Sequence, residues 1–150
     1  MHHALLLRPG ACDSGSPHLS LAGRAAVREV LRRVGLEGPL LEPTAIVSAP
    51  SPACVQTAEL AASALDYLGA VAVLPGLVAP SPAEVVLRGL VGHDVLIVVA
   101  DEPFLSSLGA AIAGRPSFPT HTPGQASLFD GRSPVGYWRA GASMQQLLLA

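Results

Sequence analysis

The sequence contains no lysine and has little charge of either sign. Charged residues make up 13% of its 150 residues, and all nine basic residues are arginines. The formal net charge is −2 and the pI is near 6.2, with no run of basic residues anywhere. Proteins that bind nucleic acid or anionic membranes carry a basic patch or stripe, which is missing here. We therefore expect no nucleic acid and no membrane among the partners.

Cysteines, targeting signals and long apolar runs are also scarce. No stretch approaches the roughly 20 apolar residues needed to cross a bilayer, and the first residues lack the basic leader and cleavage site of a secretory signal. Cys12 and Cys54 are too few for a disulfide framework, and no set of His, Cys and acidic residues, the pair His2 and His3 included, has the spacing of a zinc motif. We expect free thiols, a cytoplasmic location, and no metal or cofactor.

Hydrophobic residues, in contrast, make up half of the chain. This composition is far from that of disordered proteins, and a length of 150 residues suits one core better than two. We predict a single domain over residues 1–150.

Short apolar runs bounded by turn residues predict the strands of a sheet. Residues 94–100 (DVLIVVA) form a continuous β-branched run, typical of a strand covered on both faces, so we place this strand at the centre. Further strands are predicted at 3–8, 44–48, 70–74, 125–129 and 135–139.

Helical patterns lie between these strands. Ser20 is a candidate N-cap for a helix whose apolar residues recur at helical spacing until Gly35, which supplies a stop signal; they are Val27, Val30, Leu31 and Val34. Ser51, followed by Pro52 at the first helical position, predicts a second helix with Cys54 on its buried stripe.

Two more helices are predicted farther along the chain. Residues 81–84 (SPAE) match a capping box and predict a helix to about residue 91. A fourth, apolar helix is predicted after Asp101, through about residue 113. Strands that alternate with helices predict a three-layer α/β/α sandwich with a mostly parallel central sheet.

Three segments carry a family resemblance. They read LLLRPG, SAPSPACVQTAE and VLIVVADEP, and each lies at the end of a predicted strand. In order and context they resemble the histidine phosphatase superfamily, specifically its small phosphohistidine phosphatase (SixA-like) branch. There the corresponding segments contain Arg-His-Gly, Ser-Pro-x-x-Arg-Ala-x-Gln-Thr and Gly-His-x-Pro. The resemblance spans most of the chain and implies the phosphoglycerate-mutase-like fold of that superfamily.

The resemblance also implies that most of the catalytic centre is missing. Arg8 matches the first phosphate-binding arginine, but Pro9 stands at the nucleophilic histidine, Ala53 at the second arginine and Asp101 at the second histidine. Proline has no nucleophilic nitrogen, alanine cannot donate to phosphate, and aspartate introduces a charge that repels an anion. We therefore expect a pseudophosphatase that acts as a binding, scaffolding or regulatory module.

Arg8 and Asp101 each have two interpretations at this stage. Arg8 is either a remaining phosphate-site arginine or a structural arginine bound to backbone carbonyls. Asp101 is the replacement for the family's second histidine, the N-cap of the following helix, or both. If the fold brings both residues to one pocket, a hypothesis follows that they form an ion pair that fills the phosphate position.

Other functions remain open. One alternative is a repurposed phosphohydrolase that uses Cys12 or His18 in a remodelled pocket, and another is a sensor that holds a weak anionic or phosphorylated ligand on Arg8. His18 and His121 are candidates for the pocket rim, or else solvated loop histidines. The partner, a protein or a weak anionic ligand, is not identified by the sequence, and we expect a monomer or a homodimer.

Overall fold

A six-stranded mixed sheet forms the centre of the protein in the computed structural model, which describes residues 1–141. Its strands are β1 (His3–Leu7), β2 (Ala45–Ser48), β3 (Ala72–Val73), β4 (Val95–Val99), β5 (Ala126–Asp130) and β6 (Ser133–Trp138). They are ordered β3-β2-β4-β1-β5-β6; the first four are mutually parallel, whereas β5 and β6 are antiparallel to their neighbours. The predicted mostly parallel sheet is confirmed.

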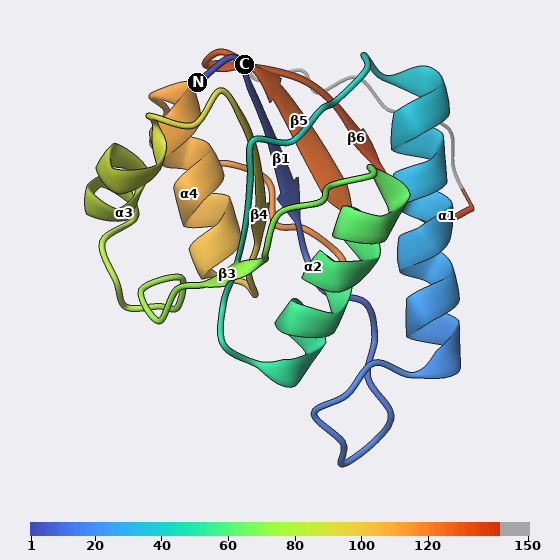
Figure 1. The fold of residues 1–150 in the computed structure, drawn as a ribbon. Coiled ribbons are helices and arrows are strands. Elements are labelled where there is room, and N and C mark those ends of the chain that lie inside the picture. The colour runs from blue at the N-terminus through green and yellow to red at the C-terminus, as the bar shows by residue number, and fades with distance from the viewer. Residues whose placement is uncertain (142–150) are drawn as a thin grey trace.

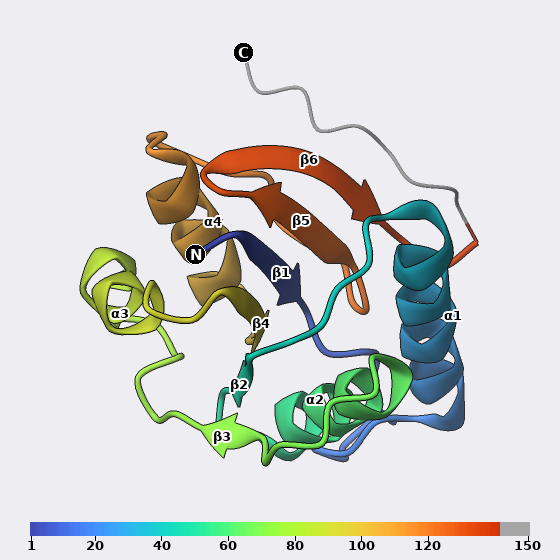
Figure 2. The ribbon, with the colours of Figure 1, turned by 45° about the horizontal axis from the view of Figure 1, so that its top comes forward.

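Helices cover both faces of the sheet. They are α1 (Leu21–Glu37), α2 (Pro52–Ala64), α3 (Ala83–Leu90) and α4 (Phe104–Ala113). Figure 1 and Figure 2 show α1 and α2 packed together on one face, with α3 and α4 on the other. This is the predicted α/β/α sandwich. Within residues 1–141, no helix has both the length and the apolar character needed to span a membrane.

Strand β4 occupies the central place predicted for residues 94–100. It is paired in parallel with β1 on one side and β2 on the other, and Leu96 to Val99 are all buried. A strand enclosed on both faces needs apolar side chains at every position, which explains its continuous apolar run. The predicted strand at 70–74 is observed only as Ala72–Val73, an exposed edge strand.

Helix α1 does not end at Gly35 as predicted but continues to Glu37. Glu37 accepts hydrogen bonds from Arg33 Nη1 at 3.3 Å and from Trp138 Nε1 at 3.1 Å. Both partners hold the last turn in place. The contact with Trp138, which comes from β6, outweighs the low helix propensity of Gly35, about 1 kcal/mol relative to alanine.

The predicted caps of the first two helices are confirmed. Ser20 Oγ accepts from the backbone N–H of Gly23 at 2.9 Å, and Ser51 Oγ accepts from that of Cys54 at 3.3 Å. Each hydroxyl satisfies one of the free amides of a first helical turn.

The predicted caps of the last two helices are wrong. α3 begins after Pro82 with no side-chain cap, so the capping box at 81–84 does not form. α4 begins after Pro103, two residues beyond Asp101. Glu102 takes over the capping contact, since its Oε1 accepts from the backbone N–H of Ser106 at 2.7 Å. Asp101 is left with its carboxylate available to the neighbouring pocket.

Candidate functional site

The carboxyl ends of the parallel strands bring the three sequence segments together. Leu7 and Ser48 are both register partners of Val99, so β1, β2 and β4 end in one row. The residues that follow each strand therefore meet at a single edge of the sheet. In open α/β sheets this edge is where ligands usually bind.

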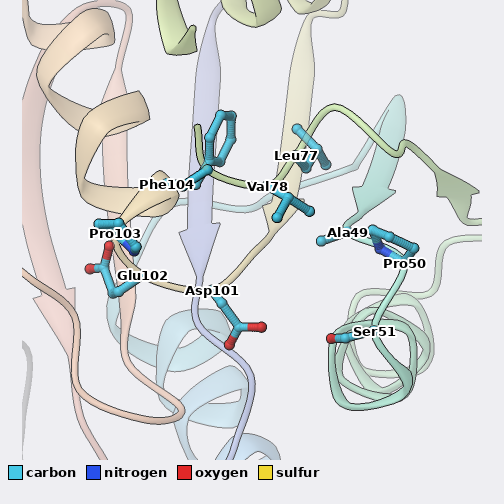
Figure 3. A pocket seen from close by; sticks show the side chains of 10 residues that line it. Ala49, Pro50, Ser51, Leu77, Val78, Asp101, Glu102, Pro103 and Phe104 are labelled. Carbon is cyan, nitrogen blue, oxygen red and sulfur yellow. The ribbon is translucent and has the colours of Figure 1, made fainter. Parts of the chain in front are cut away.

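A pocket of about 570 Å³ lies at this edge, between the turn after β2 and the turn after β4. Figure 3 shows these turns on opposite sides, with Phe104, Leu77 and Val78 between them. Most of the wall is apolar, and the lining residues include no lysine, arginine or histidine; they are Ala49, Pro50, Ser51, Leu77, Val78, Ala79, Asp101, Glu102, Pro103 and Phe104.

Asp101 is the residue that gives the pocket its charge. Its side chain is exposed, and Figure 3 shows its carboxylate directed toward the side of the pocket that carries Ser51, whereas the carboxylate of Glu102 is turned away. Within residues 1–141 its one side-chain hydrogen bond comes from Cys54, whose Sγ lies 3.6 Å from Oδ2. A thiol is a weak donor, so most of the accepting capacity of this carboxylate remains available.

Cys54 is fully buried, as predicted from its place on the apolar stripe of α2. Burial raises the pKa of its thiol to about 12, and the negative charge of Asp101 adds to this effect, although a hydrogen bond from Ser51 opposes it. A thiol in this state is not a nucleophile at neutral pH.

Arg8 does not form the ion pair with Asp101 that was hypothesised. Its Nη1 instead donates to the backbone carbonyl of His121 at 2.7 Å, and neither residue is a member of an ion pair with the other. The hypothesis failed because the loop before β5 supplies a carbonyl acceptor beside Arg8, which a sequence-based alignment of motifs cannot reveal. Arg8 thus makes the backbone contact expected of a structural arginine.

Pro9 and Ala53 are both buried and do not line the pocket. The carbonyl of Pro9 accepts from the backbone N–H of Gly124 at 3.0 Å, and Ala53 lies in the first turn of α2. Of the four positions carried over from the family, the structure places Asp101 alone on the pocket wall.

His121 lies neither on the pocket rim nor in solvent. It is 1% exposed and bridges two side chains: Nδ1 lies 2.9 Å from Glu102 Oε2, and Nε2 lies 2.8 Å from Ser127 Oγ. Its ring also stacks on Phe118 with centroids 5.9 Å apart. These three partners, Glu102, Ser127 and Phe118, hold the ring of His121 inside the protein.

This hydroxyl–imidazole–carboxylate chain has the connectivity of a hydrolase triad. Ser127, however, has 0% exposure and lies within β5 between β1 and β6. No substrate can reach a hydroxyl enclosed in this way, so the chain from Glu102 through His121 to Ser127 joins α4 to the sheet as a structural network.

Glu102 is ionised in this network. Its burial acts to raise the pKa, but hydrogen bonds from the imidazole and backbone N–H of His121 and from the backbone N–H of Ser106 prevail and lower it to about 2. The carboxylate is thus committed to these donors and has little left to offer a ligand.

His18 and Cys12 lie in the loop between β1 and α1 and are not among the residues that line the pocket. Both are exposed, and His18 Nδ1 lies 2.9 Å from Gln56 Nε2. In the part of the chain that the structure describes, the His18 ring is bonded to Gln56, and no hydrogen bond joins the Cys12 thiol to a base of the kind that activates a cysteine nucleophile. Within residues 1–141, no carboxyl-edge residue belongs to a group that could hold a metal.

The layers, the strand order and the site at the carboxyl edge define an α/β protein with the histidine phosphatase fold. The structure is similar to that of the protein histidine phosphatase SixA complexed with tungstate, with a TM-score of 0.73 and 18% identity over 92% of this chain and 96% of that one. No protein-family model matches the sequence, and no curated protein matches it either.

Two further structures show the same likeness. A putative phosphohistidine phosphatase SixA from Agrobacterium tumefaciens has a TM-score of 0.67 and 16% identity, covering 91% of this chain and 97% of its own. A mycobacterial glucosyl-3-phosphoglycerate phosphatase complexed with VO3 has a TM-score of 0.64 and 17% identity, covering 85% and 92%. The expected phosphoglycerate-mutase-like fold is confirmed.

Sequence reasoning missed the structural roles of three residues. Glu102 and Ser127 carry no predicted role, and Cys54 is predicted only as a buried residue of the second helix. Their contacts join residues that are 6, 19 and 47 positions apart in the chain. No local pattern carries a signal for them.

Proposed function

We propose that this protein does not hydrolyse phosphate esters but binds a ligand that combines a positively charged group with an apolar body. The observation that carries the proposal is the exposed Asp101 carboxylate on an otherwise largely apolar pocket wall that contains no basic side chain. A cation gains favourable electrostatic energy beside Asp101, whereas a phosphate dianion is repelled.

The loss of hydrolysis rests on the chemistry of the replaced positions. Phosphoryl transfer to a histidine needs a nucleophilic nitrogen and cationic donors around the transferred group. Pro9 and Ala53 supply neither, and both are buried. Loss of one such donor costs on the order of 100-fold to 1,000-fold in rate, and here several are missing.

A phosphatase assay tests this part of the proposal. We expect the unmodified protein to hydrolyse p-nitrophenyl phosphate and a phosphohistidine peptide no faster than buffer, with SixA as the active control. A revertant with Pro9→His, Ala53→Arg and Asp101→His asks whether the scaffold still supports the reaction. Robust turnover by the unmodified protein would contradict the proposal.

Calorimetric titration tests the ligand class. 2-Phenylethylamine carries an ammonium group on an apolar body, and 2-phenylethanol is its neutral counterpart of similar shape. We expect the amine to bind more tightly, and Asp101→Asn to remove the difference because it deletes the charge and keeps the size. Equal affinity for both compounds in the unmodified protein would rule out the cationic ligand class.

A sensor that holds an anion on Arg8 is the second candidate. Arg8 is half-buried, and one of its amino groups is bound to the carbonyl of His121, which leaves other donors on the guanidinium. Titration with inorganic phosphate separates the anion sensor from the protein that binds a cationic ligand. Phosphate binding that is lost in Arg8→Gln supports the anion sensor. We propose further that the partner that binds in the Asp101 pocket is a small ligand or a protein. We also propose that the chain is a monomer or a homodimer.

We also propose a cytoplasmic location. Both cysteines are free, which suits a reducing compartment. Fractionation of cells that express the chain tests this point.

A further inference from the structure

The edge of the sheet opposite the pocket holds a cluster of three side chains that suit a metal ion. They are His2, His3 and Asp130, and one ligand atom from each lies within 4.8 Å of the others. Figure 1 and Figure 2 show the N-terminus beside the turn between β5 and β6, which explains how residues 2 and 130 meet.

Backbone geometry places the two histidines on the same side. Successive residues of a strand normally point to opposite faces. Here the backbone N–H groups of His2 and His3 both donate to the carbonyl of Asp94, at 2.7 and 3.1 Å. Two amides on one acceptor interrupt the alternation, as at a β-bulge. The imidazole centroids consequently lie 4.4 Å apart.

Strand pairing places the carboxylate beside them. Asp130 is the register partner of His3 at the end of β5, and the next residue, Gly131, donates its N–H to the carbonyl of His2 at 2.7 Å. Arg132, the basic residue nearest to Asp130 in the sequence, donates from Nε to the carbonyl of Ile112 at 3.1 Å.

We propose that His2, His3 and Asp130 form a binding site for a divalent transition metal, with Zn²⁺ as the favoured ion. Two imidazole nitrogens and one carboxylate oxygen are typical ligands of Zn²⁺, whereas Mg²⁺ and Ca²⁺ prefer oxygen ligands. Bonds of about 2.0–2.2 Å place tetrahedral ligand atoms about 3.5 Å apart. Atoms that lie within 4.8 Å of one another therefore need to approach by at most about 1.3 Å. His2 and Asp130 are exposed and His3 is half-buried, so side-chain rotation can close this gap.

The site joins the first residues of the chain to the β5–β6 hairpin. Its three protein ligands leave a further coordination position for water. The proposal does not depend on the function of the pocket, which lies at the other edge of the sheet.

Calorimetric titration of the untagged full-length protein with zinc chloride tests the site. We expect one ion per chain, and at least tenfold weaker binding in His3→Ala and in Asp130→Asn. His93→Ala is the matched control: His93 is an exposed histidine next to Asp94 but not a member of the cluster, so its loss should change the affinity by less than twofold.

Thermal unfolding gives a second readout that does not rely on the calorimetry. Excess zinc should raise the Tm by roughly 2 °C or more in the unmodified protein and in His93→Ala, but not in Asp130→Asn, and magnesium should have no effect. The proposal is overturned by an absence of zinc binding, or by a loss in His93→Ala as large as in His3→Ala, which would indicate non-specific binding to surface histidines.

Discussion

Glu102 Oε2 accepts the backbone N–H of His121 at 2.6 Å and also lies 2.9 Å from Nδ1 of the same residue. The carboxylate at the start of α4 thereby holds the loop before β5 by both its main chain and its side chain. The same loop carries the carbonyl that binds Arg8. Glu102, which lines the pocket, therefore also holds the loop that binds Arg8.

Substituting Glu102 by glutamine should change the acid stability of the protein. The pKa of Glu102 is lowered from 4.5 to about 2, so its contribution is fully present above pH 4.5 and is lost as the pH falls toward 2. We expect Glu102→Gln to cost about 1–3 kcal/mol at pH 7 and to weaken the pH dependence between 4.5 and 2. Urea unfolding at several pH values measures both effects.

Glu29→Gln is the matched control for this experiment. Glu29 pairs with Arg33 on the surface of α1 at 3.4 Å, and exposed pairs of this kind contribute little. If both variants show the same loss at pH 7, the buried network has no special role.

The two thiols should differ strongly in reactivity. Cys12 is exposed, whereas Cys54 is buried and its pKa is raised to about 12. We expect one thiol per chain to react rapidly with Ellman's reagent in the native protein, and two after unfolding in urea. Cys12→Ser should abolish the rapid reaction, and a fast reaction that persists in this variant would show that Cys54 is accessible.

Thr57 has a buried hydroxyl without a hydrogen-bond partner in residues 1–141. A buried hydroxyl without a partner is unfavourable, so Thr57→Val should raise the free energy of unfolding by about 1 kcal/mol. Thr44→Val is the contrasting variant, because Thr44 Oγ1 donates to the carbonyl of Val95 at 3.1 Å and accepts its N–H at 3.0 Å. It should lower stability by about 0.5–1.5 kcal/mol. Denaturant unfolding measures the stability of both variants. A loss of stability in Thr57→Val together with a gain in Thr44→Val would show that the two hydroxyls are not bonded as described.

Two helical glycines should respond oppositely to alanine. A Cβ at Gly35 of α1 meets nothing within 4 Å, so Gly35→Ala should stabilise by about 1 kcal/mol through helix propensity. A Cβ at Gly109 of α4 would lie 2.7 Å from Cδ1 of Phe118, so Gly109→Ala should destabilise by about 1–3 kcal/mol. Thermal unfolding distinguishes the two, and stabilisation by Gly109→Ala would show that the ring of Phe118 moves freely.

Much of the fold could be predicted because its signals are local. The buried stripe of α1, the continuous apolar run of β4 and the serine caps of α1 and α2 each depend on residues within a few positions. The predicted stop at Gly35 and cap at 81–84 failed where tertiary contacts or backbone geometry outweighed a local preference.

The site was predictable to a smaller extent. Its place at the carboxyl edge followed from the order of the three motifs, and Asp101 indeed lies on the pocket wall. The expected partner of Arg8 was wrong, and the burial of His121 was not foreseen. Both depend on how the loop before β5 packs, over a separation of 113 residues in the case of Arg8.

The amino-acid sequence by itself determined the alternation of strands and helices, the central place of β4 and the chemical types at the four family positions, because these are properties of neighbouring residues. The tertiary structure decided which charges meet. In the folded chain Arg8 donates to the carbonyl of His121 and not to Asp101, and the Asp101 carboxylate faces a largely apolar pocket. Asp130 lies beside His2 and His3, which are at the other end of the chain. Such pairings depend on distances between segments remote in sequence, and only a folded chain sets those distances.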